Sequence, residues 1–427
     1  MSIIEDEYAV YLPAVNTIYA QALIREPDNQ RPYPKLFELE DLEFWRKGSK
    51  LWHHPHFLHS VGQYPVGSVP YNAVTKRGRS DGVLFGDSGG FQIGKGKLAG
   101  IEGLEGELDP IEACRIWRDA YEARQWILEW LETHTNYAMT IDMPLWATTD
   151  DNAGTPFHRC SHDQLTQLTV ENLKFIDSHR HDRTKWLNVI QGFDLDGMTK
   201  WWKAVKWFPC SGYALSSSGA KMTGMKALLE PLLMMRDDKA FVKGRDWIHM
   251  LGVSTAPWAV MFTSIQRAMR AHVNPNMRIS FDSSSPFQQA ARYERYAELP
   301  QFGSNPADWA IKFQPTPQSR KHVNSGIPLP FTSPIADKLR MGDLNVRDGT
   351  YEHKQFDQLS LAFIANHNVW VYLEAFRIAN DLLFAGDRVR VPSFYAECVD
   401  LIDHVFKAEN WSTALENEAG LLNQFTG

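Results

Sequence analysis

Short apolar runs alternate with longer amphipathic segments through most of the chain. The runs occur in the stretches FLHSVG, VLFGDSGGFQ, YAMTIDMP, WLNVIQG, GYALSSSG, WIHMLGVS and RISFDSSSP. Between them, segments with helical spacing of apolar positions lie at about residues 109–132, 161–179, 198–207, 225–235 and 257–271. Because regular alternation of strands and helices is typical of parallel α/β folds, this pattern predicts a (β/α)8 barrel.

A polar side chain follows the apolar run in most of the predicted strands. In a closed barrel the carboxyl ends of all strands meet on one face, where such folds carry their chemistry. We therefore expect six side chains to line a single pocket: Asp87, Asp142, Gln191, Ser216, Ser217 and Asp282.

The rest of the chain divides into an extension, a barrel domain and an insertion. Residues 1–50 are interpreted as an N-terminal extension and residues 51–427 as the catalytic barrel domain. Irregular, proline-rich sequence predicts an insertion at 316–358, after a last strand near 309–313. Two further helical patterns are expected to close the fold, at 359–383 and 393–406.

The stretch VLFGDSGGFQ places an acid directly before a glycine turn. Asp87 ends the apolar run, and Gly89 and Gly90 permit backbone geometry that a side chain would block. Phe91 adds a flat apolar face beside the acid. A catalytic carboxylate and a solvated carboxylate on an ordinary turn explain this stretch equally well.

Composition narrows the class of protein. A chain of 427 residues can bury a large core without a partner, and its net charge of −7 argues against broad electrostatic wrapping of nucleic acid. A local basic groove remains compatible with that charge. The four cysteines lack CxxC spacing, which favours a reducing cytoplasm, and we find neither a leader pattern nor a run of about 18 apolar residues. We therefore expect a cytoplasmic protein without membrane contact.

Four histidines crowd around the first predicted strand, at His53, His54, His56 and His59. Their spacing matches no metal-ligand pattern, so roles in the core and on the surface are favoured. Two carboxylates on one barrel face, Asp87 and Asp282, are more informative. Cleavage of a glycosidic bond needs a nucleophile or charge stabiliser and a separate proton carrier, a requirement that many glycosidases meet.

The order of the motifs narrows this chemistry. DSGGFQ, IDMP, VIQG, GYALSSSG, HMLGVS and ISFDSSSP occur in the same order as the core motifs of queuine tRNA-ribosyltransferases, also called tRNA-guanine transglycosylases. The chain resembles this superfamily over roughly residues 80–290 and again at HNVWVYLEAF in the last long helix. DSGGFQ is distinctive and the other motifs are individually weak, so their shared order carries the resemblance.

The resemblance implies a role for each matched residue. Asp282 would attack the C1′ carbon of the sugar, so that guanine leaves and a covalent sugar–enzyme intermediate remains. Asp87 would be the general acid/base, and Phe91 would stack on the base. Asp142 and Gln191 would hydrogen-bond the edge of guanine. The other implied substrate-binding residues are Ser88, Gly89, Gly90, Gly192, Ser216, Ser217 and Leu251.

The insertion departs most from the family pattern. Family members that act on tRNA carry a CxCxxC cluster there and complete a zinc site with the His of an HN pair. This chain keeps the HN pair at His367 but has no cysteine between Cys210 and Cys398. With three thiolate ligands missing, we expect no structural zinc, and His322 and His353 are the remaining candidates for a site without thiolates.

The chain keeps the barrel motifs but lacks the zinc cysteines. In this combination it resembles the phage branch of the superfamily, the DNA 7-deazaguanine transglycosylases. The resemblance implies that the partners are DNA and a free 7-deazaguanine base, that no organic cofactor is needed, and that the location is the cytoplasm of the host. Many relatives dimerise, and the sequence leaves open whether this chain forms a homodimer. The alternatives are a tRNA-guanine transglycosylase, a glycoside hydrolase and a nucleic-acid-binding protein without catalysis.

Two basic sets are candidates for phosphate contacts. The first interleaves lysines with tryptophans and comprises Lys200, Trp201, Trp202, Lys203, Lys206 and Trp207. The second lies in or near the insertion and comprises Arg320, Lys321, Lys338, Arg340 and Arg347. For any single member, a solvated helix face is the competing explanation.

Overall fold

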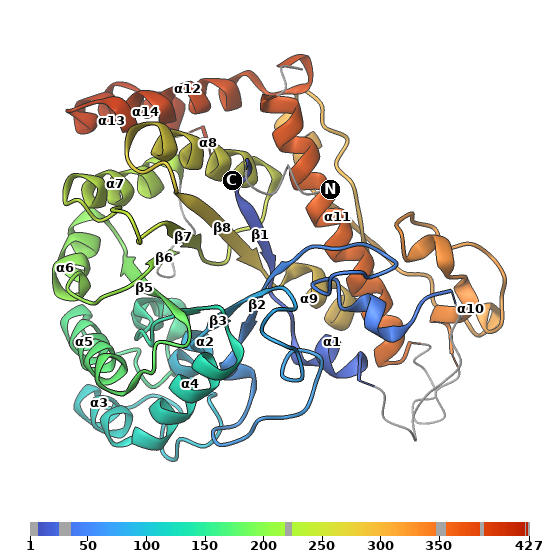
Figure 1. Ribbon diagram of the computed structural model, residues 1–427, viewed down its shortest axis with the longest axis horizontal. Coiled ribbons are helices and arrows are strands. Elements are labelled where there is room, and N and C mark those ends of the chain that lie inside the picture. Colours follow the sequence, from blue (N-terminus) through green and yellow to red (C-terminus); the bar gives the residue numbers. More distant parts are fainter. Residues whose placement is uncertain are drawn as a thin grey trace.

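The computed structural model describes residues 7–24, 36–217, 224–346, 356–384, 388–422 and 424–425, without the side chains of Ser217 and Arg388. Within these residues, eight parallel strands form one sheet that rolls into a barrel with helices around it (Figure 1). The strand order is β1-β8-β7-β6-β5-β4-β3-β2, which confirms the predicted (β/α)8 fold. The strands are β1 Val10–Pro13, β2 His56–Ser60, β3 Val83–Asp87, β4 Tyr137–Met139, β5 Lys185–Gly192, β6 Gly212–Ser217, β7 Trp247–Met250 and β8 Arg278–Ser283.

Strand β1 closes the barrel, although it lies within the segment 1–50 interpreted above as an N-terminal extension. It pairs with β8 along its length, and its four residues are buried. On its other side Ala14 bridges Leu58 of β2, and the Val15 nitrogen donates to the Leu58 carbonyl at 2.8 Å. The barrel therefore begins at Val10.

The strand expected near 309–313 is wrong as a barrel strand. Strand β10, Lys312–Pro315, pairs antiparallel with β9, Arg295–Glu298, in a separate two-stranded sheet. Most of the residues of β10 are exposed, whereas a strand between β8 and β2 must be buried on both faces. The apolar sequence VYLP of β1 meets that requirement, so β1 takes the position.

Helices follow most strands, and most lie where the spacing predicts them. The expected helix at 109–132 is two helices, because the backbone of Ala120 leaves helical geometry with ψ at 52°. The longer helices are α3 Pro110–Asp119, α4 Tyr121–His134, α5 His162–His179, α6 Leu195–Val205, α7 Gly224–Asp237, α8 Ala256–His272, α9 Ser285–Tyr293, α11 Gln358–Phe384 and α12 Ser393–Lys407. The shorter ones are α1 Thr17–Ala22, α2 Gly90–Gly94, α10 Met341–Leu344, α13 Trp411–Asn417 and α14 Ala419–Leu422.

Apolar side chains from the strands fill the barrel interior. Because side chains alternate between the two faces of a strand, Val83, Phe85 and Asp87 of β3 share one face. Phe85 stacks on Tyr137 with ring centroids 4.7 Å apart and packs against Trp247 at 5.2 Å. The same alternation that buries these rings therefore directs Asp87 toward the end of the barrel, above the packed core.

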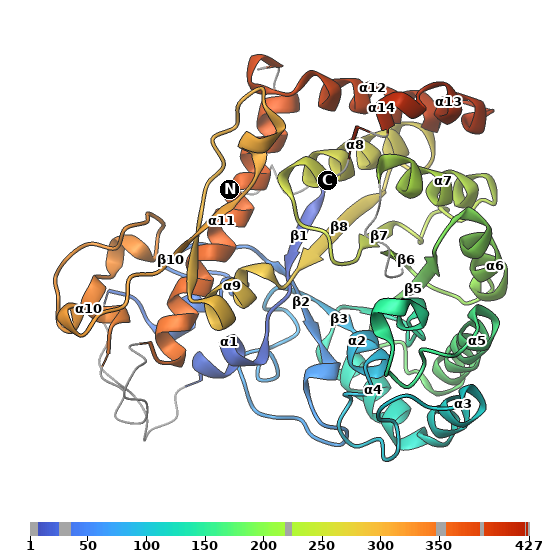
Figure 2. The same cartoon turned by 180° about the vertical axis from the view of Figure 1, so that it is seen from behind.

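The insertion lies on the side of the molecule away from α6, where α10 and its loops stand beside the lower part of α11 in both views (Figure 1, Figure 2). Its described part is mostly irregular, and residues 347–355 lie outside the described ranges. None of the described helices combines the length and the apolar character that a membrane crossing requires.

Candidate active site

Asp282 lies at the carboxyl end of β8, and two nitrogen atoms lie close to one of its carboxylate oxygens. Its Oδ1 accepts a hydrogen bond from the Gly252 nitrogen at 2.8 Å and lies 3.2 Å from His249 Nε2. The residue is 8% exposed. Both contacts fall on Oδ1, so the carboxylate is oriented rather than free to rotate.

Three buried side chains stand behind Asp282, and sequence reasoning missed them. His249 Nδ1 lies 2.9 Å from Ser280 Oγ, which accepts from Trp247 Nε1 at 2.7 Å. The register of β7 and β8 places His249 opposite Ser280, two residues before Asp282 on the same face. A signal was present in the alternation of polar positions within WIHML and ISFDS, which gives both strands an inward polar residue.

Asp87 ends β3, where the parallel register places it beside Ser60 of β2. Burial raises the pKa of Asp87 above its usual range, and the negative charge of Asp282 raises it further. The Ser60 side chain, the Gly89 nitrogen at 3.3 Å and His249 act in the opposite direction. The site thus pairs an acid whose Oδ1 is contacted by two nitrogen atoms with a buried acid whose pKa is raised.

Asp142 follows β4 and is a third acid in the same cluster. Burial raises the pKa of Asp142 to about 7, and the negative charge of Asp87 contributes to the shift. The expected convergence of acids is therefore observed as electrostatic coupling, between Asp282 and Asp87 and between Asp87 and Asp142. A small change in pH near neutrality changes the charge of this end of the barrel.

Gln191, at the end of β5, holds the Asp142 loop. Its Nε2 donates to Asp142 Oδ2 at 2.5 Å and to the Met143 carbonyl at 3.2 Å, and its Oε1 accepts from the Leu145 nitrogen at 2.9 Å. A side-chain amide has two hydrogens, and both are taken in this state. Direct contact of Gln191 with a base stays a prediction, and donation from its amide nitrogen would require one of these bonds to open.

The turn after Asp87 requires glycine because its backbone packs closely against that of Gly62. Gly89 has a φ of +87°, and a Cβ there would lie 2.9 Å from the Gly62 Cα. Ser88 is buried with its hydroxyl donating to the Thr140 carbonyl at 3.1 Å, which links β3 to the segment after β4. A Cβ on Gly90 would lie 3.8 Å from Asp142 Oδ1, so the open side of the turn faces Asp142.

Phe91 is 58% exposed at the start of α2, four residues after Asp87. Its ring stacks on Trp146 of the loop after β4, with centroids 5.6 Å apart and planes 30° from parallel. Lys95 reaches over the same indole at 5.4 Å. An exposed aromatic ring is the kind of surface on which a flat ligand stacks.

The other predicted contacts lie at the ends of β5, β6 and β7. Ser216 and Ser217 pair with Gln191 and Gly192, and the side chain of Ser217 lies outside the described residues. A Cβ on Gly192 would lie 2.4 Å from the backbone of Met198, so the absence of a side chain here allows α6 to pack closely against the end of β5. Leu251 is half-buried against the barrel interior.

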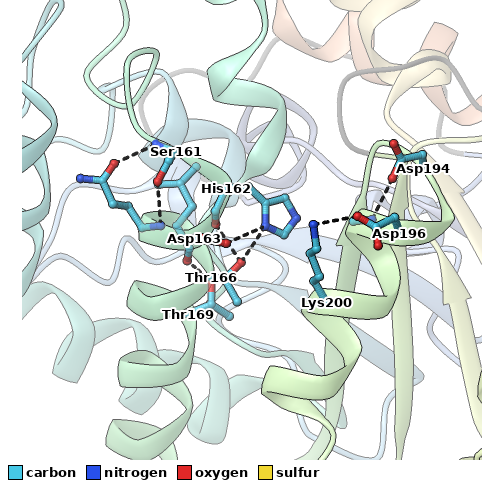
Figure 3. A network of polar contacts seen from close by, with 11 residues as sticks. Ser161, His162, Asp163, Thr166, Thr169, Asp194, Asp196 and Lys200 are labelled. Carbon is cyan, nitrogen blue, oxygen red and sulfur yellow. Dashed lines mark hydrogen bonds and ion pairs between the residues drawn. The ribbon is translucent and has the colours of Figure 1, made fainter.

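Phosphate contact by the lysine and tryptophan set at α6 stays a prediction, and two of its tryptophans do not reach the surface. Trp201 and Trp202 are buried, and their indole nitrogens donate to the Val189 carbonyl and to Asp238. Lys206 also pairs with Asp238. Figure 3 shows Lys200 turned toward Asp196, with which it forms an ion pair at 2.7 Å, near the capped start of α5. The tryptophans face inward because apolar positions on α6 repeat with the helical period.

The basic residues of the insertion lie partly at the surface. Arg320, Lys321 and Arg340 are exposed and Lys338 is half-buried. The Arg340 guanidinium donates to the Leu339 carbonyl at 2.8 Å, and Arg347 lies outside the described residues. Their contact with nucleic acid stays a prediction.

Among the described residues, no group of three or more His, Cys, Asp or Glu side chains is arranged to hold a metal ion. His367 is buried with its Nε2 at 2.9 Å from the Ala297 carbonyl, and burial lowers its pKa to about 4. His322 is half-buried and His353 lies outside the described residues. His54, His56 and His59 are packing residues whose pKa values burial lowers to between about 3 and about 4.

Comparison with protein-family models found no matching family, and comparison with curated proteins found no match. The function therefore has to be argued from the site and from the resemblance of its motifs.

Proposed function

We propose that the protein is a transglycosylase that exchanges guanine in DNA for a 7-deazaguanine derivative. The observation that supports this proposal best is the contrast between the two coupled acids. Asp282 has one oxygen contacted by the Gly252 and His249 nitrogens, while burial and the charge of Asp282 raise the pKa of Asp87. An oriented carboxylate suits the role of nucleophile, and a neighbouring acid with a raised pKa suits the role of proton carrier.

The proposed reaction has two halves. A deoxyguanosine leaves the duplex stack, and the Asp282 carboxylate forms a bond to C1′ while the bond from C1′ to guanine N9 breaks. The bonding electrons leave with guanine, and protonated Asp87 supplies a proton to the departing base. In the second half, Asp87 removes the N9 proton of the incoming base, N9 bonds to C1′, and Asp282 leaves as a carboxylate.

Asp142 is the proposed reader of the base. An ionised carboxylate accepts hydrogen bonds only, and guanine presents an N1–H and an amino group as donors on one edge. A 7-deazaguanine keeps this edge, since it differs from guanine at position 7. One acceptor site therefore fits both the leaving and the incoming base, and Phe91 is the proposed stacking surface for either.

Incubation of the full chain with labelled guanine, together with either DNA or tRNA, tests the proposal. We expect label to enter DNA with the wild type and with Asp163→Ala, which removes a 96% exposed carboxylate at the start of α5. We expect no incorporation and no denaturation-resistant DNA adduct with Asp282→Ala. Full exchange by Asp282→Ala would refute the assignment of Asp282 as the nucleophile. Incorporation of label into tRNA alone would favour a tRNA-guanine transglycosylase.

A further inference from the structure

A chain of three buried polar side chains runs from the barrel core to the Asp282 carboxylate. Trp247 is 4% exposed, and His249 and Ser280 are fully buried. The chain lies among the apolar side chains of the barrel interior, including Phe85, whose ring faces that of His249 with centroids 6.2 Å apart. Buried polar groups cost free energy unless they are hydrogen-bonded, and here each member bonds the next.

The donors and acceptors of the chain fit one direction. An indole nitrogen only donates, so Ser280 Oγ accepts from Trp247 at 2.7 Å. The serine can then donate its hydrogen to His249 Nδ1, 2.9 Å away, and in that direction the imidazole hydrogen lies on Nε2. The Nε2–H group then points at Asp282 Oδ1, 3.2 Å away, as its donor.

We propose that Trp247, Ser280 and His249 position the nucleophile by fixing the Nε2–H tautomer of His249. With the Gly252 nitrogen, His249 occupies Oδ1 of Asp282, and the other oxygen, Oδ2, forms the bond to the sugar. The proposal rests on the proposed function for its reaction. His249 acts through Asp282 and is a positioning residue.

The partner of His249 distinguishes positioning from packing. His59 is as deeply buried and also has both ring nitrogens bonded, but its partners are the Val15 carbonyl and the Tyr64 hydroxyl. His249 also has both ring nitrogens bonded, and its Nε2 contacts the carboxylate of Asp282, the group with the proposed chemistry.

The tautomer can be measured independently of activity. Nitrogen-15 NMR of the histidine side chains, with the His249 signals assigned by comparison with His249→Gln, reports which ring nitrogen carries hydrogen. We expect the neutral Nε2–H form in the wild type and a mixture of forms in Ser280→Ala. A wild-type Nδ1–H tautomer or an imidazolium at neutral pH would overturn the proposal whether or not the protein exchanges bases.

Single-turnover formation of the DNA adduct measures the consequence. We expect Ser280→Ala and His249→Leu to lower its rate about 100-fold with little change in KM, because small displacements of a reacting group have effects of this size. Gln at 249 keeps a donor in the position of Nε2, so we expect it to restore much of the rate. Ser360→Ala is the matched control, since it removes a buried hydroxyl that donates to the Leu344 carbonyl, far from Asp282 in sequence.

The outcomes separate the two proposals. A rate for Ser280→Ala equal to that of the wild type and of Ser360→Ala would overturn the positioning role while leaving the transglycosylase proposal intact. Absence of exchange on both DNA and tRNA, with the Nε2–H tautomer present and dependent on Ser280, would refute the proposed function. The orientation of Asp282 by His249 would then be supported for a different reaction.

Discussion

Gln191 donates a hydrogen bond from Nε2 to Oδ2 of Asp142, 2.5 Å away, although the two residues are 49 positions apart in the chain. The bond joins the end of β5 to the loop after β4. It fixes one oxygen of an acid whose pKa burial raises to about 7. The proposed base reader is therefore held in place and sensitive to pH near neutrality, and two predictions follow from this relationship.

Affinity for free guanine should depend on the charge of Asp142. The carboxylate accepts the donors of the base only when ionised, and its pKa of about 7 means that protonation increases as the pH falls below neutrality. We expect the Kd for guanine to rise about tenfold between pH 8 and pH 6. Calorimetric titration across this range checks it, and a pH-independent Kd in the wild type would exclude Asp142 as the acceptor.

Stability should fall with rising pH in a way that Asp142→Asn removes. The pKa of Asp142 in the folded protein, about 7, lies above the usual aspartate value of 3.8. The contribution of Asp142 to stability is therefore fully present below about pH 4 and is lost as the pH rises through 7. Relative to Asp142→Asn, we expect the wild type to lose up to about 4 kcal/mol of unfolding free energy between pH 4 and pH 8. Urea unfolding at both pH values measures the difference, with Asp163→Asn as the exposed control.

The glycine turn should not tolerate a side chain at Gly89. Alanine there would adopt an unfavourable φ of +87° and would place its Cβ 2.9 Å from the Gly62 Cα. We expect Gly89→Ala to lower the unfolding free energy by roughly 2–4 kcal/mol. Gly48→Ala isolates the backbone cost, because Gly48 has a φ of +96° with no atom within 4 Å of its added Cβ. Equal losses in the two variants would show that contact with Gly62 is unimportant.

Phe91→Ala should weaken substrate binding with little effect on stability. Its ring is 58% exposed and contacts Trp146, and stacking of a base on an aromatic ring contributes about 1–3 kcal/mol. We expect KM for DNA or for the free base to rise about 10- to 100-fold. Phe193→Ala removes another exposed ring, 43% exposed after β5, and serves as the comparison. An unchanged KM in Phe91→Ala would show that this ring does not contribute to substrate binding.

The fold class and the acid cluster could be predicted because both depend on local patterns. Strand–helix alternation indicated the barrel, and the strand ends placed Asp87, Asp142 and Asp282 on one face. Their electrostatic coupling in the structure agrees with that placement. Helix α5 likewise lies where the helical spacing at 161–179 predicts it, with Ser161 as the N-cap of His162–His179.

Local patterns could not identify the strand that closes the barrel. Four apolar residues near the N-terminus, VYLP, look like any short apolar segment, and only the space between β8 and β2 selects them. The interleaved lysines and tryptophans at α6 show the same dependence on packing. Trp201 and Trp202 are buried because their face of α6 packs on the barrel, while the lysines of the set lie on the exposed side.

By itself, the sequence determined the barrel class and the positions of the acids and the glycine turn, because strand periodicity and backbone freedom act over a few residues. The tertiary structure alone decided what surrounds each acid. His249 and Gly252 reach Asp282 across about 30 residues, and Gln191 reaches Asp142 across 49. Hydrogen-bond partners at such separations are chosen by the register of neighbouring strands, so the orientation and charge of the acids are properties of the closed barrel.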